Sequence, residues 1–209
     1  MSINAQCKIC RRAGKKLFLK GERCQTSACA LVKRSYAPGL HGQKTAGSRL
    51  TDYGRQLREK QSAKNTYNLR EKPFLNYFKK AVKKGEETGP AVFRMLEMRL
   101  DNVILRLGFA KSVKQARQIV SHEHVKVNDR KVNISSYQVK VNDIISLKER
   151  SVKESKLFAD LDERLKNYTC PDWLYYDEKT KSGKVVDLPD IKKAALPFDM
   201  RAIIEFYSR

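Results

Sequence analysis

Four of the chain's five cysteines lie close together near its start, with the spacing C-x2-C-x13-C-x4-C: Cys7, Cys10, Cys24 and Cys29. A Cys-x-x-Cys pair can direct two thiolates at one metal ion, and a second pair can complete the tetrahedral set that Zn²⁺ prefers. A closed set of four thiolates leaves no ligand position open, so such an ion would be structural. An iron–sulfur cluster uses the same ligands, and reduced thiols without metal are the third interpretation. We predict one zinc ion, with Cys170 outside the site.

Positive charge surrounds and follows these cysteines. The 209 residues include 44 Lys and Arg against 23 Asp and Glu, a net charge of +21, and the whole excess lies in residues 1–150. Such a chain attracts polyanions, because each neutralised phosphate releases counterions, whereas solubility alone needs a smaller charge. The longest apolar run has five residues, which predicts neither a signal peptide nor a membrane partner. We therefore expect a cytosolic protein, with reduced thiols, that binds nucleic acid.

Helical patterns dominate the first half of the sequence. Segments 52–64 and 71–84 are helix-prone, and the second is predicted to bury a face made of Phe74, Leu75, Phe78 and Val82. The dipeptide Gly89-Pro90 then indicates a break in the chain and a candidate domain boundary. The spacing of apolar residues after it predicts a single helix over 93–107.

The second half mixes helices with strands. Ser112 precedes Gln115 by three residues, which is typical of a capping box at the start of a helix. The apolar period then drops to two over 125–134, and Asn128-Asp129 is predicted to form the turn of a hairpin. A further strand, a helix and a second hairpin are predicted at 142–149, 152–167 and 173–188. The apolar run at 200–209 is compatible with either a helix or a strand.

Basic and amide side chains gather on the helix after Ser112 and on the first hairpin. Lys and Arg suit phosphates, and Gln, Asn and His can hydrogen-bond to RNA backbone or 2′-hydroxyls. A charged helix face is usually only solvated, but the helix–hairpin order and the net charge favour RNA. The predicted RNA-binding residues here are Lys111, Ser112, Lys114, Gln115, Arg117, Gln118, His122, Lys126, Asn128, Arg130 and Lys131. Those of the first 60 residues are Arg11, Arg12, Lys15, Lys16, Lys20, Arg34, His41, Lys44, Arg49, Tyr53, Arg55, Arg58 and Lys60.

Several stretches resemble one known family. The segment from "RLDNVILRLGFAKS" to "NDIISL" (99–147) resembles the small RNA-binding domain named after ribosomal protein four of the small subunit. The stretches "KLFLKGERC", "APGLHGQK", "DYGRQLREKQ" and "IIEFYSR" resemble that ribosomal protein family itself, in its bacterial or organellar form. The four cysteines are similar to those of its zinc-type members. The resemblance spans nearly the whole chain, with its motifs in the expected order.

The resemblance implies an α+β fold in three parts. These are a zinc-bound segment (1–45), an all-helical domain (46–90, completed by 189–209) and an inserted α/β domain (91–188). The inserted domain would combine helices with a small antiparallel sheet and contain the RNA-binding module at about 99–160. The family often has Gly where this chain has Glu123, Asp129 and Asn142. We expect the hairpin to form with Asp129, and the helix end near Glu123 to differ locally.

The same resemblance implies a structural ribosomal protein that binds small-subunit ribosomal RNA early and nucleates assembly of the subunit body. It implies contact with ribosomal protein five of the small subunit, an influence on decoding accuracy, and a position near the channel through which messenger RNA enters. One alternative is a free RNA-binding regulator, for example of its own messenger. The other is an RNA-modifying enzyme, because "RLDN" (99–102) is similar to the catalytic stretch of pseudouridine synthases. We expect Asp101 instead to pair with a neighbouring base on a helix surface, and predict no catalysis.

Overall fold

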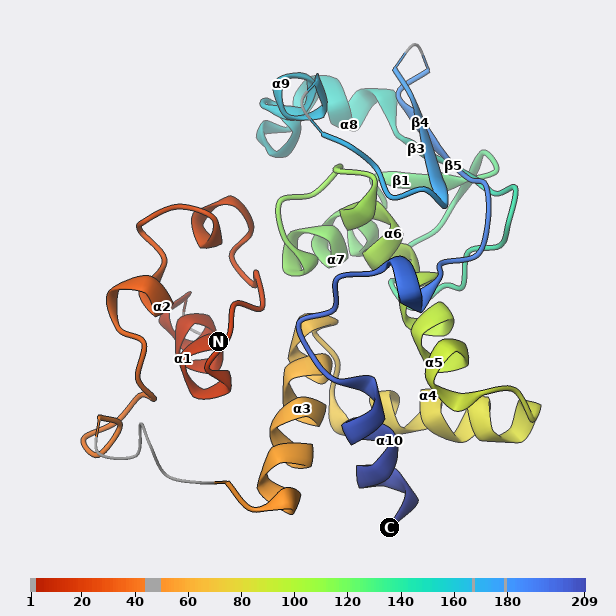
Figure 1. Ribbon diagram of the computed structural model, residues 1–209. Helices are drawn as coiled ribbons and strands as arrows, with labels where there is room; N and C mark the ends of the chain where they lie inside the picture. Colours follow the sequence, from red (N-terminus) through yellow and green to blue (C-terminus); the bar gives the residue numbers. More distant parts are fainter. Residues whose placement is uncertain (1–2, 44–49, 167, 179) are drawn as a thin grey trace. The chain divides into compact units, whose positions relative to one another are not determined.

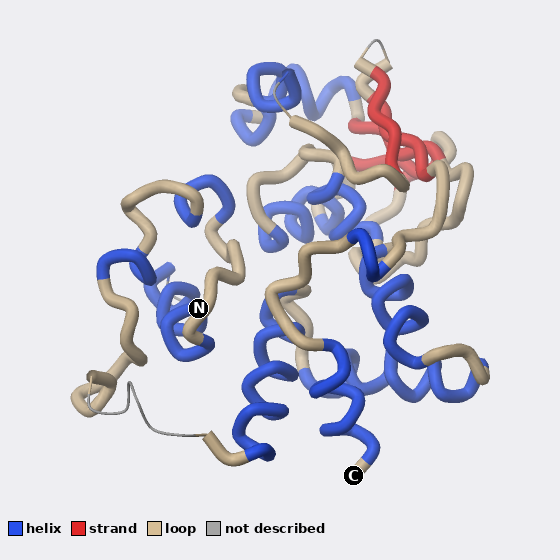
Figure 2. Tube along the Cα trace, viewed as in Figure 1, coloured by secondary structure: helices blue, strands red, loops and turns tan. Residues whose placement is uncertain are grey.

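A computed structural model describes residues 3–43, 50–166, 168–178 and 180–209 (Figure 1). The chain divides into two compact units, Met1–Val92 with Lys193–Arg209, and Phe93–Lys192. The first unit is helical in its described part, and the strands gather in the second (Figure 2). This outcome agrees with the expected mixture of helices and a small antiparallel sheet. The division into three parts stays a prediction.

The first unit is built around three longer helices, and its N-terminal part adds shorter ones. The longer helices are α3 (Asp52–Thr66), α4 (Glu71–Lys84) and α10 (Met200–Ser208), and the N-terminal elements are α1 (Ile3–Ala13), η1 (Gly21–Cys24) and α2 (Ala30–Lys33). Thr51 caps α3 by accepting a hydrogen bond from the backbone N–H of Gly54, as is common at a helix start. The C-terminal segment, whose sequence is compatible with a helix or a strand, forms the helix α10. It packs along α3, although more than a hundred residues separate the two in the sequence (Figure 1).

The core face of α4 differs from the prediction at one position. Phe74, Phe78 and Ala81 are buried, whereas Val82 is 65% exposed. The buried residues follow i, i+4, i+7 spacing, which keeps them on one face, and Val82 lies one residue beyond it. The ring of Tyr207 from α10 packs 4.7 Å from that of Phe78, so the C-terminal helix completes this core.

The single helix expected over 93–107 is wrong, because the structure has two helices there. These are α5 (Thr88–Glu97) and α6 (Leu100–Arg106), with Arg99 in an extended conformation between them. The break is held by backbone pairing with a distant segment: the N–H of Val139 donates to Met98 O, and that of Leu100 to Tyr137 O, both at 2.9 Å. These bonds satisfy backbone groups that a continuous helix would have used internally.

The break predicted at Gly89-Pro90 is the start of a helix in the structure. Both residues lie in the first turn of α5, where a proline needs no backbone N–H, so the dipeptide begins a helix instead of breaking the chain. The division between the two units falls a few residues later, inside α5, after Val92.

The second unit contains a five-stranded antiparallel sheet in the order β2-β1-β3-β5-β4. The strands are short: β1 (Val125–Val127), β2 (Arg130–Lys131), β3 (Ile144–Leu147), β4 (Leu174–Asp177) and β5 (Ser182–Val185). Both predicted hairpins are confirmed, β1–β2 and β4–β5. Helix α7 (Val113–Ser121) precedes β1, and Ser112 caps it as predicted. The helix expected over 152–167 is interrupted and comprises α8 (Glu149–Glu154), η2 (Lys156–Phe158) and α9 (Leu161–Lys166). The short helix η3 (Ile191–Lys193) lies where the chain passes from the second unit back to the first.

The three positions at which the family often has glycine all adopt the left-handed backbone conformation. Glu123 has φ 58°, Asp129 φ 63° and Asn142 φ 73°. Asp129 forms the hairpin turn with Asn128, whose φ is also positive at 48°, as a tight two-residue turn requires. Glu123 follows the end of α7, where glycine is favoured because it has no Cβ. The expected hairpin therefore forms, and the strain falls on Glu123.

The core of the second unit lies between α6, α7 and the sheet. Ile104, Leu107, Ile119 and Ile145 are fully buried in it. A side chain at Gly183 of β5 would collide with the methyl groups of Leu107, so this strand position needs glycine. In the part of the chain that the structure describes, no helix is both long enough and apolar enough to cross a membrane.

Candidate metal centre and nucleic-acid interface

Three short elements bring the four N-terminal cysteines together. Cys7 and Cys10 lie one turn apart on α1, Cys24 is the last residue of η1, and Cys29 precedes α2. All four line one small pocket of about 20 Å³, whose other walls include Leu19 and Leu31. Cys10 and Cys24 are buried, and no disulfide joins any of the four. Residues up to 22 positions apart in the sequence thus face the same space.

The surroundings of Cys10 and Cys24 oppose the ionisation of these two thiols. Burial raises the pKa of the Cys10 thiol, the backbone N–H of Leu17 acts in the opposite direction, and charge on Cys24, Cys7 or Cys29 would raise that pKa further. Burial likewise raises the pKa of Cys24, against a hydrogen bond from the backbone N–H of Lys20 at 3.4 Å. The two N–H groups are aimed at sulfur, so they would stabilise thiolates if a cation offset the mutual repulsion.

The arrangement of side chains stops short of a ligand set. Among residues 3–43 and the other described ranges, no group of three or more His, Cys, Asp or Glu is placed as a metal-ion site. The thiols border one pocket, and rotation about their Cα–Cβ bonds would decide whether they converge on one point. The predicted zinc ion therefore stays a prediction.

Several predicted RNA-binding residues near the cysteines make contacts within the chain. Arg11 donates from Nε to Tyr36 O at 2.9 Å and stacks over the Tyr36 ring, with its Cζ 4.8 Å from the ring centroid. Lys15 forms an ion pair of 2.6 Å with Glu59 of α3. The guanidinium of Arg11 and the ammonium of Lys15 thus help to hold the N-terminal segment in place. The remaining predicted residues in the described part of this segment are at least partly exposed: Arg12, Lys16, Lys20, Arg34 and His41.

Helix α3 carries four of the predicted RNA-binding residues, of which three are exposed and one is buried. Tyr53, Arg55 and Arg58 are exposed. Lys60 is buried, its ammonium donates to Glu71 Oε1 at 2.8 Å, and it lies 4.5 Å above the ring of Phe206. The structure therefore places Lys60 inside the helical unit, where it is not available to a phosphate. The predicted residues Lys44 and Arg49 lie outside the described part of the chain.

In the second unit, the exposed face of α7 and the first hairpin carry most of the predicted contacts. Lys114, Arg117 and Gln118 follow i, i+3, i+4 spacing on the exposed side of α7, and His122 is exposed just after it. Lys126 of β1 stands directly opposite Lys131 of β2. Two like charges in such a pair destabilise a sheet, and a bound anion would remove that cost. Arg130 is exposed at the adjacent position.

The other predicted residues of this region support the fold. Ser112 accepts a hydrogen bond from the backbone N–H of Gln115, and the Gln115 side chain accepts one from Lys111 N at 2.7 Å. The Lys111 ammonium donates to Asp160 at 2.7 Å in an exposed position. Asn128 fixes the hairpin turn, because its side chain donates to Asp143 and accepts from the backbone N–H of Ile144.

The "RLDN" stretch is buried and serves the interior. Asp101 receives two hydrogen bonds from Arg99, at 3.0 and 2.6 Å, and both side chains are almost fully enclosed. The expected pairing of Asp101 with a neighbouring basic side chain is confirmed, but its expected position on the helix surface is wrong. Next to this pair, Glu97 binds Asn102 and forms a bidentate pair with Arg106. These contacts stabilise the break between α5 and α6.

The sequence patterns did not predict a second pocket in the first unit. A pocket of about 370 Å³ lies between α1 and α3, with Ile9 on one wall and Leu57, Gln61 and Asn65 on the other. The last three are spaced by four residues, so they share one face of α3. That face is mainly polar, so the spacing of apolar residues does not indicate a pocket there.

Comparison with known proteins identifies relatives over almost the full length. A family profile described as "Ribosomal protein S4/S9 N-terminal domain" matches residues 2–97, and one described as "S4 domain" matches residues 98–145. The chain is 51% identical over 203 residues to small ribosomal subunit protein uS4 of Kosmotoga olearia, covering 97% of this chain and 96% of the relative. It is 47% identical over 209 residues to that of Acetivibrio thermocellus, covering 98% and 97%.

Proposed function

The chain belongs to the family of small ribosomal subunit protein uS4, and we infer from this premise that it is a structural, RNA-binding protein of the small ribosomal subunit. The observation that carries this function is the identity of about half of all residues with uS4 proteins along the whole chain. The relatives are of the bacterial type, so its place is the ribosome in the bacterial cytoplasm. Sedimentation of a cell extract tests the function: the chain should travel with small subunits in a one-to-one ratio. A chain found mainly in ribosome-free fractions would instead be a regulator.

Binding of RNA would rest on exposed cations in both units. In the first unit these include Arg12 and Arg58, and in the second Lys114 and Lys131, with the half-buried Lys126 beside Lys131. Because phosphate contacts release counterions, affinity for small-subunit RNA should fall steeply as salt rises. Affinity that does not change between low and high salt would contradict this phosphate-based mechanism.

We propose further that Cys7, Cys10, Cys24 and Cys29 hold one structural Zn²⁺. The donor atoms suit the ion, because four thiols border one pocket and two backbone N–H groups point at sulfur atoms there. Zn²⁺ supplies the positive charge that four thiolates need and contributes folding free energy to a segment with little apolar surface. An iron–sulfur cluster is the less favoured occupant, since nothing in the segment calls for electron transfer.

The metal proposal has a direct test. Purified chain should contain about one equivalent of zinc by atomic emission, and Ser at all four positions should abolish it and weaken RNA binding. Cys170→Ser is the matched control, because this thiol lies outside the pocket, and it should leave the metal content unchanged. Metal-free wild-type chain would refute the site, and visible absorption with bound iron would assign it to a cluster.

The finer roles of the chain are also proposals. We propose that it binds small-subunit RNA early and nucleates assembly of the subunit body, contacts ribosomal protein five, and affects decoding accuracy. A position near the channel through which messenger RNA enters belongs to the same proposal. The support is the family membership. Reconstitution of small subunits without this chain should stall, and subunits carrying altered chain should misread more often.

We propose that the chain has no enzymatic activity of its own. The relatives reported above are named as ribosomal proteins and not for a reaction. The one acid with a resemblance to a catalytic residue, Asp101, is buried and held by Arg99. Formation of pseudouridine in ribosomal RNA above background, when purified chain is added, would overturn this proposal.

A further inference from the structure

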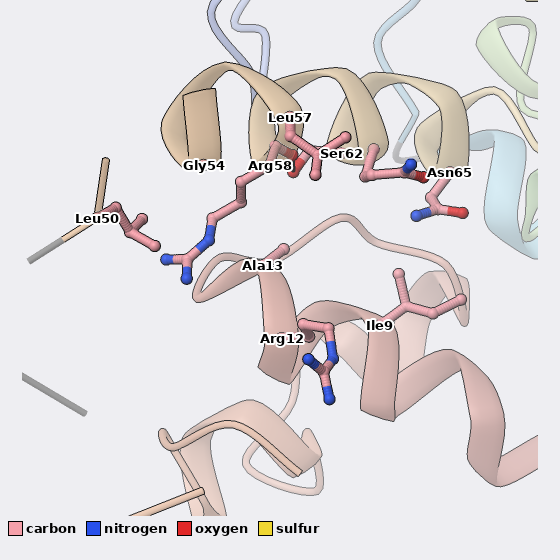
Figure 3. Close-up of a pocket in the computed structure, with 10 residues that line it drawn as sticks. Ile9, Arg12, Ala13, Leu50, Gly54, Leu57, Arg58, Ser62 and Asn65 are labelled. Carbon is pink, nitrogen blue, oxygen red and sulfur yellow. Dashed lines mark hydrogen bonds between the residues drawn. The ribbon is translucent and has the colours of Figure 1, made fainter. Parts of the chain in front are cut away.

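A pocket lies between α1 and α3 and is lined by side chains of both helices (Figure 3). Its volume of about 370 Å³ lies near the lower end of the ~300–1,000 Å³ typical of small-molecule sites. Ile9 and Ala13 of α1 and Leu57 of α3 line its interior, and both helices belong to the first unit. An apolar interior of this size suits one flat ring system, and is too small for a helix or a strand.

The pocket also carries positive charge and hydrogen-bonding groups, but no acid. Arg12 extends from α1 and Arg58 from α3 (Figure 3). Among the described residues, no ion pair joins either guanidinium to an acidic side chain. Guanidinium groups bind phosphate oxygens and stack on the faces of bases. The side-chain amide of Gln61 can both donate to and accept from the edge of a base. A ligand with an apolar ring and flanking anionic groups fits these three features together.

We propose that this pocket receives one unstacked base of the bound ribosomal RNA, with the phosphates beside it held by Arg12 and Arg58. The proposal rests on the inferred function as a binder of small-subunit RNA, and it adds where and how one nucleotide is recognised. RNA is commonly recognised through bases that are turned out of the helix and enclosed by protein side chains. Burying the faces of one base against apolar side chains should contribute roughly tenfold to affinity, because apolar surface removed from water is worth about 25 cal/mol per Å².

The test fills the pocket without changing its charge. Ala13→Phe fills it from α1 and Gln61→Phe from α3, while Ala195→Phe adds the same ring at an exposed position of the same unit. Each full-length variant is bound to small-subunit ribosomal RNA, and affinity is measured by filter binding. Dimethyl sulfate then reports which bases are protected, and circular dichroism verifies the fold.

Wild-type chain should protect one base from dimethyl sulfate, and both pocket variants should leave that base reactive. The two variants should bind the RNA about tenfold more weakly, with an unchanged salt dependence. Ala195→Phe should behave as wild type. Wild-type affinity and an unchanged pattern of protected bases in both pocket variants would overturn the base site and leave the general function standing. Failure of the wild-type chain to bind the RNA at all would overturn both.

A second pair of variants keeps the test decisive if the bulky ring disturbs folding. Arg58→Gln removes one charge at the pocket, and Lys84→Gln removes one exposed charge at the end of α4. Both should weaken binding through lost phosphate attraction, but only Arg58→Gln should also expose the single base. Identical base protection in the two variants would refute the proposal.

Discussion

Neutralising Glu71 at the start of α4 tests the role of Lys60 as an interior cation. Three groups donate to this carboxylate: Lys60 at 2.8 Å, Tyr207 at 2.8 Å and Lys64 at 3.1 Å. Burial alone would raise the pKa of Glu71, but these hydrogen bonds outweigh it and lower the pKa from 4.5 to about 2. The contacts join α3, α4 and α10, so their loss should destabilise the whole helical unit.

The size of the effect follows from the pKa of Glu71. Lowering the pKa of Glu71 from 4.5 to about 2 corresponds to at most about 3 kcal/mol. The Glu71 side chain is 45% exposed, so solvent screening reduces this to about 1–2 kcal/mol. Since the folded-state pKa is the lower one, the contribution is complete above the ordinary pKa of 4.5 and is lost as pH falls through that value towards 2.

The assay is urea unfolding of wild type and Glu71→Gln at a series of pH values. Glu71→Gln should lower the free energy of unfolding by about 1–2 kcal/mol at neutral pH, and the difference should fall below half by about pH 3. Glu178→Gln, which neutralises an exposed carboxylate of the second unit, is the control and should change little at any pH. A difference between wild type and Glu71→Gln that stays constant with pH would refute the reasoning, because it could not come from the charge.

Two further predictions concern the second unit. Asp101→Ala should lower the free energy of unfolding by about 3–5 kcal/mol in urea, because it leaves the buried guanidinium of Arg99 without its partner; a loss below about 1 kcal/mol would show that water replaces the carboxylate. Glu123→Gly should raise thermal stability by about 0.5–1 kcal/mol, since glycine removes the strain of φ 58° after α7. A drop in melting temperature would mean that the contacts of the Glu123 side chain with Asn133 and Lys148 outweigh the strain.

Local sequence signals predicted the elements that are governed by local physics. The N-cap at Ser112 and the turn at Asn128-Asp129 form where the side chains favour them. The break at Arg99 was not predictable from the same signals, because the apolar spacing continues on both sides of it. Its cause is pairing with residues 137–139, almost forty positions away, and a buried ion pair that only the tertiary fold creates.

The candidate site was predictable in composition but not in detail. The spacing of the four cysteines was sufficient to expect them around one point, and they do line one pocket. The roles of individual cations were not predictable, because Lys60 has the same local setting as its exposed neighbours on α3. Lys60 is buried because α10 packs against α3 and places the ring of Phe206 over its ammonium group. The base-sized pocket depends in the same way on the packing of α1 against α3.

The distribution of acids explains which cations remain for RNA. Residues 1–50 contain eleven Lys and Arg but a single acid, Glu22, so this segment cannot neutralise itself. Lys15 finds its partner in Glu59 of α3, while Arg12, Lys33 and Arg34 are exposed. By contrast, Arg99 and Arg106 of the second unit have Asp101 and Glu97 close by in the sequence, and they are held by them. A cation of this chain is therefore structural where the fold offers it an acid or, as for Arg11, backbone carbonyl oxygens and an aromatic ring. The excess positive charge of residues 1–50 is left to attract an anion from outside the chain.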